Sequence, residues 1–196
     1  MKNIYPLLFI LVAITAKSQN WQTVYSDRIQ YFDSSRQAIK IIHKYVDSAG
    51  DSVFRNYTQY MIDSSGNSSR PYGKIKDSSS WIGRRILIKS NGYNAFVNDS
   101  NQLYWIKTQA QLHDTFTYIE NSRFHIKGIC DTVYYADTFG ITDSVKRFKF
   151  TFAAKPGYAG NFGDTSKFEI LLSKHHGLLK TPVYGGVVKK YGIFPT

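Results

Sequence analysis

Residues 145–152 have the sequence VKRFKFTF, in which phenylalanine occupies every second position from Phe148 to Phe152. Successive side chains of a β-strand point to opposite faces, so a period of two places these phenylalanines on one face. We expect that face to be buried and the face with Arg147, Lys149 and Thr151 to be solvated. The stretch therefore predicts a strand with one wet face, which is typical of antiparallel sheets.

Similar short runs of β-branched and aromatic residues, separated by Asp, Ser, Asn and Gly, recur from residue 22 to residue 191. No segment in this part of the chain has the period of 3.6 residues that indicates an amphipathic helix. The runs predict an all-β fold, an antiparallel meander of about ten or eleven strands that forms a sandwich, barrel or half-barrel. We expect the first strand at residues 22–32 and separate strands at residues 124–129 and 132–136.

The dipeptide Asn91-Gly92 lies between the expected strands 84–90 and 93–98. Asn-Gly is a strong hairpin signal because both central residues of a type I′ turn need positive φ. We therefore expect a two-residue hairpin at this point.

The N-terminus has the parts of a secretory signal peptide: a basic start at Lys2, an apolar run over residues 4–14, and small residues at Ala16 and Ser18. We expect cleavage before Gln19, which makes residues 1–18 the signal peptide. A retained anchor or a buried first helix is the alternative, but the run is shorter than the ~20 apolar residues that span a bilayer. The mature chain is then exported, periplasmic or extracellular, with no transmembrane segment.

Residues 19–196 form a single β-rich domain by length, long enough to bury roughly 70% of its unfolded surface. Cys130 is the only cysteine, so the domain has no intramolecular disulfide and depends on packing. It shares its parity with Phe124 and Ile126, which predicts a small buried hydrophobe rather than a reactive thiolate. An exported chain without disulfides fits a bacterial envelope better than an animal secretory fluid.

The charge is strongly positive, with 25 Lys and Arg against 14 Asp and Glu. Loss of Lys2 and Lys17 with the signal peptide leaves 23 against 14, or +9. A field of that sign favours an anionic glycan, lipopolysaccharide or another acidic partner. Because the charges are spread along the chain, they serve solubility equally well. No nucleic-acid-binding module accompanies them, which disfavours nucleic acid.

A short triplet recurs at residues 51–53, 131–133 and 143–145, in which Asp is followed by Ser or Thr and then by Val. Asp and Ser/Thr side chains bond to nearby backbone in turns, so each triplet is interpreted first as a turn that precedes a strand. The triplet also resembles the acceptor for protein O-glycosylation in Bacteroidetes. That resemblance implies modification of Ser52, Thr132 and Ser144.

Four further segments, residues 81–89, 105–112, 140–146 and 172–180, occur in an order that is familiar from one group of proteins. Their sequences are WIGRRILIK, WIKTQAQL, GITDSVK and LSKHHGLLK. The series resembles an N-terminal β-rich region of Bacteroidetes secreted proteins, many of them type IX secretion clients of unknown function. Such clients end in a C-terminal sorting domain, which this sequence does not contain, so the resemblance leaves the export route open.

The search for catalytic and metal motifs assigns no residue. His175 and His176 are the only adjacent histidines, and neighbours on a strand point to opposite faces, so they are not expected to hold one ion. The sequence has no HExxH, paired CxxC or Gly-x-Ser-x-Gly motif. We therefore expect no catalytic site, no metal and no cofactor.

Binding has more support than catalysis. The tryptophans are able to stack on sugar rings, and the densest basic spots are able to contact anions. The residues predicted to bind are Trp81, Arg84, Arg85, Trp105, Lys146, Arg147 and Lys149. The competing interpretation places the aromatic residues in the core or in cross-strand pairs.

The leading hypothesis is an exported, non-catalytic envelope or extracellular β-domain that binds an anionic or amphipathic envelope component or another envelope protein. A polysaccharide or peptide hydrolase is the first alternative, and it would require two carboxylates or a Ser/His/Asp set in one cleft. The second alternative is a structural module of a larger secreted protein.

Overall fold

The structure is a computed structural model, and it describes eight stretches of the chain. They are residues 21–25, 28–33, 37–47, 52–60, 85–98, 101–158, 168–183 and 186–195. The predicted signal peptide, residues 1–18, lies outside these stretches.

The described residues contain strands and turns, with no helix among them. Twelve strands follow one another along the chain. They are β1 (Arg28–Asp33), β2 (Gln37–Val46), β3 (Ser52–Tyr60), β4 (Arg85–Ile88), β5 (Tyr93–Val97), β6 (Leu103–Lys107), β7 (Thr115–Glu120), β8 (Phe124–Thr138), β9 (Ile141–Ala154), β10 (Glu169–Ser173), β11 (Gly177–Val183) and β12 (Gly186–Pro195).

The strands form one antiparallel sheet in the order β6-β5-β4-β3-β2-β1-β12-β11-β10-β9-β8-β7. Each strand pairs with its neighbour in sequence, except that β1 pairs with β12 and the sheet is open between β6 and β7. The predicted all-β antiparallel meander is therefore confirmed. The predicted count of ten or eleven strands is wrong, because the described residues form twelve.

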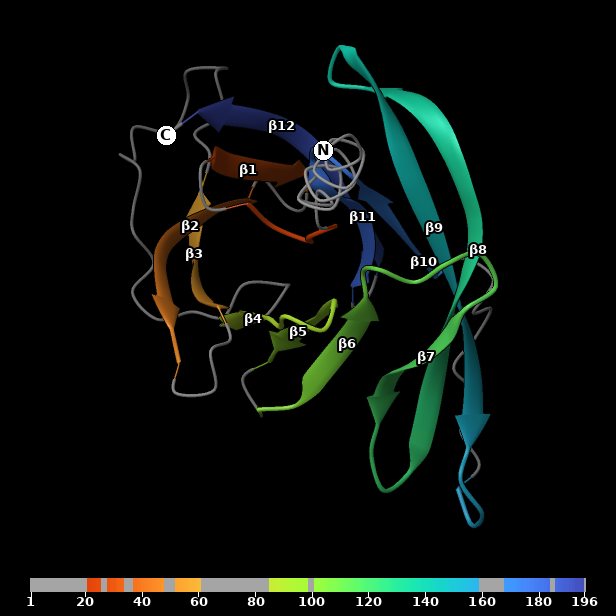
Figure 1. Ribbon diagram of the computed structural model, residues 1–196. Coiled ribbons are helices and arrows are strands. Elements are labelled where there is room, and N and C mark those ends of the chain that lie inside the picture. Colours follow the sequence, from red (N-terminus) through yellow and green to blue (C-terminus); the bar gives the residue numbers. More distant parts are fainter. Residues whose placement is uncertain are drawn as a thin grey trace, which may run out of the picture.

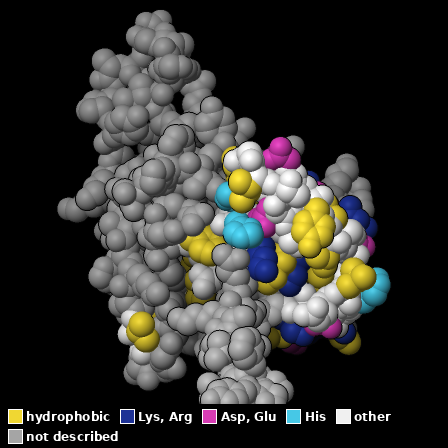
Figure 2. All heavy atoms as spheres, turned by 45° about the horizontal axis from the view of Figure 1, so that its top comes forward, with side chains coloured by type: hydrophobic (Ala, Val, Ile, Leu, Met, Phe, Trp, Pro, Cys, Tyr) yellow, Lys and Arg dark blue, Asp and Glu magenta, His cyan; other side chains and the backbone are white. Residues whose placement is uncertain are grey.

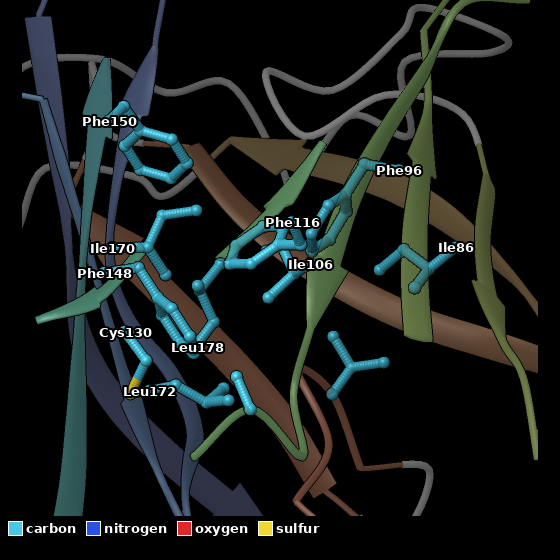
Figure 3. Packing of buried hydrophobic residues seen from close by; sticks show 12 residues of the cluster. Ile86, Phe96, Ile106, Phe116, Cys130, Phe148, Phe150, Ile170, Leu172 and Leu178 are labelled. Atoms are coloured by element: carbon cyan, nitrogen blue, oxygen red, sulfur yellow. The ribbon is translucent and has the colours of Figure 1, made fainter. Parts of the chain in front are cut away.

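The sheet curls into a half-barrel, with β6 and β7 at the opening (Figure 1). The two edge strands contact each other, and the rings of Tyr104 and Tyr118 lie 5.6 Å apart across the opening. A hydrophobic cluster lies within the curve of the sheet, and all eight strands from β4 to β11 contribute to it. Figure 3 shows Phe116, Phe148 and Ile170 pointing toward one another within this cluster.

Residues 21–25 enter the hollow of the sheet rather than forming part of a strand, so the first strand begins at Arg28 and not at residue 22. Thr23 and Val24 are buried. The Leu178 amide donates to the Thr23 carbonyl oxygen at 2.9 Å, and the Asn94 side-chain amide lies 2.8 Å from the Thr23 hydroxyl. The segment therefore joins β5 to β11 across the interior.

This close approach depends on Gly177, which has a φ of 70°. A Cβ atom at this position would lie 2.6 Å from the Thr23 carbonyl oxygen, closer than real contacts permit. Glycine tolerates the positive φ and leaves room for the segment.

The alternation predicted for residues 145–152 is confirmed from Arg147 onward. Phe148 and Phe150 are buried, whereas Lys149 and Thr151 are exposed and Arg147 is half-buried. T-shaped packing of the Phe116 and Phe148 rings, with centroids 5.6 Å apart, ties β9 to β7 across the core.

Two expectations about strand boundaries are wrong. Residues 124–129 and 132–136 belong to one strand, β8, which passes through a bulge between Cys130 and Thr132. Asp131 and Asp143 therefore lie within strands, and the turn interpretation of their triplets fails for both. A bulge takes up one extra residue without ending the strand, so polar residues at this point do not signal a turn.

A hairpin does join β4 and β5 at Asn91-Gly92, as predicted. The expected turn type is wrong, because only Gly92 of the pair has positive φ. The turn is longer than two residues, since the Lys89 amide donates to the Tyr93 carbonyl at 2.9 Å.

Candidate functional site

The most unusual surface of the described structure is the outer part of the β8–β9 hairpin, residues 132–145, which we call the distal ribbon. It rises above the rest of the sheet at the top of Figure 1. Eight large hydrophobic residues are exposed in the described chain, and five of them lie here: Val133, Tyr134, Tyr135, Phe139 and Ile141. Tyr135 is the most open, with 79% of its surface exposed.

The ribbon ends in a tight turn at Phe139 and Gly140, whose φ values are 53° and 86°. Thr138 and Ile141 pair directly on either side, so this is a two-residue hairpin with positive φ at both central positions, as in a type I′ turn. The Gly140 amide also donates to the Asp137 carboxylate at 3.2 Å. The turn thus fixes Phe139 at the tip, where the side chain is 46% exposed.

Asp143 anchors the ribbon to the turn between β10 and β11. Its carboxylate is buried and accepts four hydrogen bonds: from the Ser173 hydroxyl, the His175 amide at 2.9 Å, the His175 Nδ1 at 2.7 Å, and the Ser144 amide at 2.8 Å. Burial acts to raise the pKa of Asp143, but the hydrogen bonds outweigh it and hold the pKa below its ordinary value. Asp143 is therefore a carboxylate in the folded protein.

Two more contacts hold the same turn against the ribbon. The Lys174 amide donates to the Ser144 carbonyl at 3.0 Å, and the ring of Phe139 meets the ring of His176 edge to face at 5.4 Å. Figure 2, with the top of Figure 1 turned forward, shows hydrophobic side chains beside histidine and basic side chains on this face. We refer to Asp143, Ser173 and His175 as the anchor.

The predicted basic residues Arg147 and Lys149 lie at the base of the ribbon, where both bind Asp131. The Arg147 guanidinium is 2.6 Å and the Lys149 ammonium 3.2 Å from the Asp131 carboxylate. Bonds from Thr132 and then from Arg147 lower the pKa of Asp131 to about 2. Two cations on one carboxylate leave a net charge of +1 at this position.

Lys146 does not belong to this basic surface. It is 5% exposed, its ammonium donates to the Thr108 carbonyl at 2.9 Å, and it lies 4.2 Å from the centre of the Trp21 ring. Burial lowers its pKa. Lys146 was predicted as a binding residue, but the structure buries it, because Lys146 shares the inward parity of Phe148.

The structure does not bring the other predicted binding residues together with Arg147 and Lys149. Arg85 is exposed on β4, and Trp105 is half-buried on β6, where it packs edge to face on Tyr93 at 6.3 Å. That packing agrees with the cross-strand interpretation of the tryptophan. Trp81 and Arg84 lie outside the described residues.

The three candidate glycosylation residues lie in strands. Thr132 in β8 donates its hydroxyl hydrogen bond to Asp131 at 2.8 Å and accepts one from Arg147 at 2.9 Å. Ser144 in β9 is half-buried, and Ser52 begins β3. The Thr132 hydroxyl is thus occupied by internal hydrogen bonds in the folded chain.

The anchor contains a serine, a histidine and an aspartate, but not in the order that nucleophilic catalysis needs. In a Ser/His/Asp triad the serine hydroxyl bonds to the imidazole and the aspartate orients that imidazole. Here Asp143 is central, and the Ser173 hydroxyl donates to it directly. Ser173 is also fully buried, so its oxygen is closed to a substrate.

Sequence reasoning missed the anchor because Asp143 is 30 and 32 positions from Ser173 and His175 and no motif links them. Only the register of β9 against β10 brings them together, with Val145 opposite Ser173. Within the described stretches, no group of three or more His, Cys, Asp or Glu residues is placed to hold a metal ion.

Comparisons with known protein families, curated proteins and solved structures find no match to this chain. In the part of the chain that the structure describes, no helix is long and apolar enough to cross a membrane.

Proposed function

We propose that the chain is an exported, non-catalytic interaction module of the bacterial envelope or exterior, and that the distal ribbon is its contact surface. The observation that carries the proposal is the concentration of exposed apolar side chains on residues 133–141. Contiguous apolar surface on a soluble protein marks an interaction site more often than chance. The secretory N-terminus and the resemblance to Bacteroidetes secreted proteins support the location.

The packing of the interior supports contact at the surface over transport of a ligand inside. Core side chains and residues 21–25 occupy the concave side of the sheet, including Phe148, Ile170 and Leu178 with no measurable exposure (Figure 3). A carrier of lipid needs that space for its ligand. Among the described side chains, the apolar surface left for a partner is therefore on the outside.

We infer an amphipathic envelope component as the partner, with lipopolysaccharide as its nearest representative. The ribbon offers Tyr135 and Phe139 to an apolar portion, and the base of the ribbon carries the residual positive charge of Arg147 and Lys149. The +9 charge of the mature chain favours the approach of an anionic headgroup. Such a component pairs both features, whereas a purely anionic glycan would use only the charge.

The test measures binding of the mature chain to vesicles that contain lipopolysaccharide and to beads that carry an acidic polysaccharide. We expect Tyr135→Ser to weaken vesicle binding about tenfold, which corresponds to about 1.4 kcal/mol. Tyr158→Ser is the matched control, since Tyr158 is also exposed but lies away from the ribbon. Equal loss in both variants, or complete release of the wild-type chain at moderate salt, would contradict the proposal, because screening removes only charge attraction.

A hydrolase is the second candidate, and the pair of Asp143 and His175 favours it. A buried carboxylate orients an imidazole whose side chain is 42% exposed, which is how a general base is held for an attack by water. The test is hydrolysis of peptide and polysaccharide substrates by the wild-type chain and by His175→Ala. Turnover that disappears in His175→Ala while the fold is retained would replace the binding proposal.

A further inference from the structure

The outer edge of β8 is paired with other backbone before the bulge and faces no described strand after it. Up to Ile129 it pairs with β7, and two further bonds join Cys130 to His113 at 2.7 Å and to Asp114 at 2.9 Å. Beyond the bulge, residues 132–138 have β9 on one side, and no described strand lies on the other. This segment is therefore an open strand edge within the described structure.

The register shows which backbone groups face outward. Thr138 and Ile141 flank a two-residue turn, so they form a hydrogen-bonded pair, and such pairs alternate with non-hydrogen-bonded pairs along an antiparallel ladder. Even-numbered residues from Thr132 to Thr138 thus bond to β9. The amide and carbonyl groups of Val133, Tyr135 and Asp137 point away from it.

The opposite strand supports this assignment. Ser144 pairs with Tyr135, and its carbonyl accepts the Lys174 amide at 3.0 Å on the side away from β8. The outer edge of β9 is thus covered by the turn between β10 and β11. The edge of β8 has no equivalent cover among the described residues.

The ribbon carries few of the devices that usually block an open edge, and the one charge on the β8 edge beyond the bulge is Asp137, next to the tip. Natural proteins place Lys, Pro or other charges on such edges to prevent pairing between molecules. Residues 132–145 contain no Lys, Arg or Pro, although the chain has 25 basic residues. The edge presents apolar side chains in their place, with Val133 and Tyr135 both exposed.

We propose that a second copy of this chain pairs with the outer edge of β8 around a two-fold axis at Tyr135. Antiparallel pairing of outward-facing residues places Tyr135 opposite its own copy and Val133 opposite Asp137. No like charges meet in this register, because Asp137 is the only charged residue between Thr132 and Thr138 and its partner there is Val133. The pairing closes as a dimer, because both copies use the same patch.

The dimer does not require the envelope ligand of the proposed function. Pairing uses the edge of the ribbon and leaves its faces open, so two ribbons form one longer aromatic surface. Dimerisation and vesicle binding are therefore separate measurements, and either can fail alone.

The experiment follows the mass of the mature chain by sedimentation equilibrium from about 1 μM to about 1 mM, the range of moderate affinities. We expect a monomer–dimer equilibrium that Tyr135→Lys weakens at least about tenfold, because two like charges then meet at the axis. Tyr158→Lys adds the same charge away from the edge and should leave the equilibrium unchanged. A monomer at every concentration, or equal effects of both variants, would overturn the proposal.

Cross-linking gives a second measurement. Directly opposite Cα atoms in a hydrogen-bonded pair lie about 5.5 Å apart, within the range of a disulfide, so Tyr135→Cys should form a covalent dimer under mild oxidation. Cys130 is fully buried and does not compete. Tyr158→Cys is the control for random collision. Equal yields of dimer from the two cysteine variants would contradict pairing at Tyr135.

Discussion

The two halves of the β8–β9 hairpin belong to the same pair of strands but have opposite environments. In the lower half, β7 and β10 flank the pair, and Phe148 is fully buried. In the distal ribbon, β10 reaches only Val145 at the base and no described strand flanks β8, and Tyr135 is 79% exposed. Aromatic residues are common to both halves, so the neighbouring strands, and not hydrophobicity, decide which become core.

The halves are also held in place by different forces. The lower half is stabilised by burial of apolar area, which is non-directional and cumulative. The ribbon is positioned by directional contacts, chiefly the hydrogen bonds of Asp143 and the ring contact between Phe139 and His176. Substitutions should therefore have large effects on stability below the bulge and local effects above it.

The largest expected effect is that of Phe148→Ala, which removes a fully buried ring from the lower half. We expect a loss of about 3–5 kcal/mol in the free energy of unfolding, measured by urea denaturation. Tyr135→Ala in the ribbon is the comparison, and it should change stability by less than about 0.5 kcal/mol. Similar losses in the two variants would remove the distinction between the halves.

Asp143→Ala should have the next largest effect, because it leaves buried donors without their acceptor. We expect a loss of about 2–3 kcal/mol in the free energy of unfolding. Faster amide hydrogen exchange should be concentrated in the ribbon and in residues 174–176, which the carboxylate joins. Asp143→Asn keeps the shape and part of the bonding, so a smaller loss is expected. Uniformly faster exchange over the whole sheet would show that Asp143 supports the core instead.

The smallest expected effect is a pH dependence at the boundary between the halves. Asp131 has a pKa of about 2 in the folded chain against an ordinary value of 3.8. The unfolded chain therefore binds this proton more readily, so the contribution is complete above about pH 4 and is lost as the pH falls toward 2. Thermal unfolding of wild type and Asp131→Asn over this range measures it. The two curves should converge at the acid end, and parallel curves would exclude the Asp131 pairs as the cause.

Much of the fold could be predicted because its signals are local. The alternation from Arg147 to Thr151 and the hairpin at Asn91-Gly92 depend on neighbours in sequence, and both features are present. The burial of Lys146 was also available from the same alternation, since it stands two positions before Phe148. The positive charge of Lys146 favours a binding residue, whereas its position in the alternation predicts burial, and the side chain is buried.

The remaining features depend on contacts between distant segments. The sequence around Asp131 favours a turn, whereas the pairing of β8 with β9 places a bulge there. The two-residue turn with positive φ at both positions contains Phe139, which is not a typical residue for positive φ. The anchor and the open edge of β8 follow from which strands are adjacent and where each one ends. No short stretch of the sequence predicts the anchor or the open edge.

The insertion of residues 21–25 between β5 and β11 has a consequence for the timing of folding. Thr23 is synthesised well before Leu178, whose amide donates to its carbonyl oxygen. The same delay applies to β1, which pairs with β12. Contacts between segments so far apart in sequence form late because a long loop must close first. The contacts of Thr23 and β1 therefore wait for the synthesis of β11 and β12, whereas the hairpins between them need only strands that are adjacent in sequence.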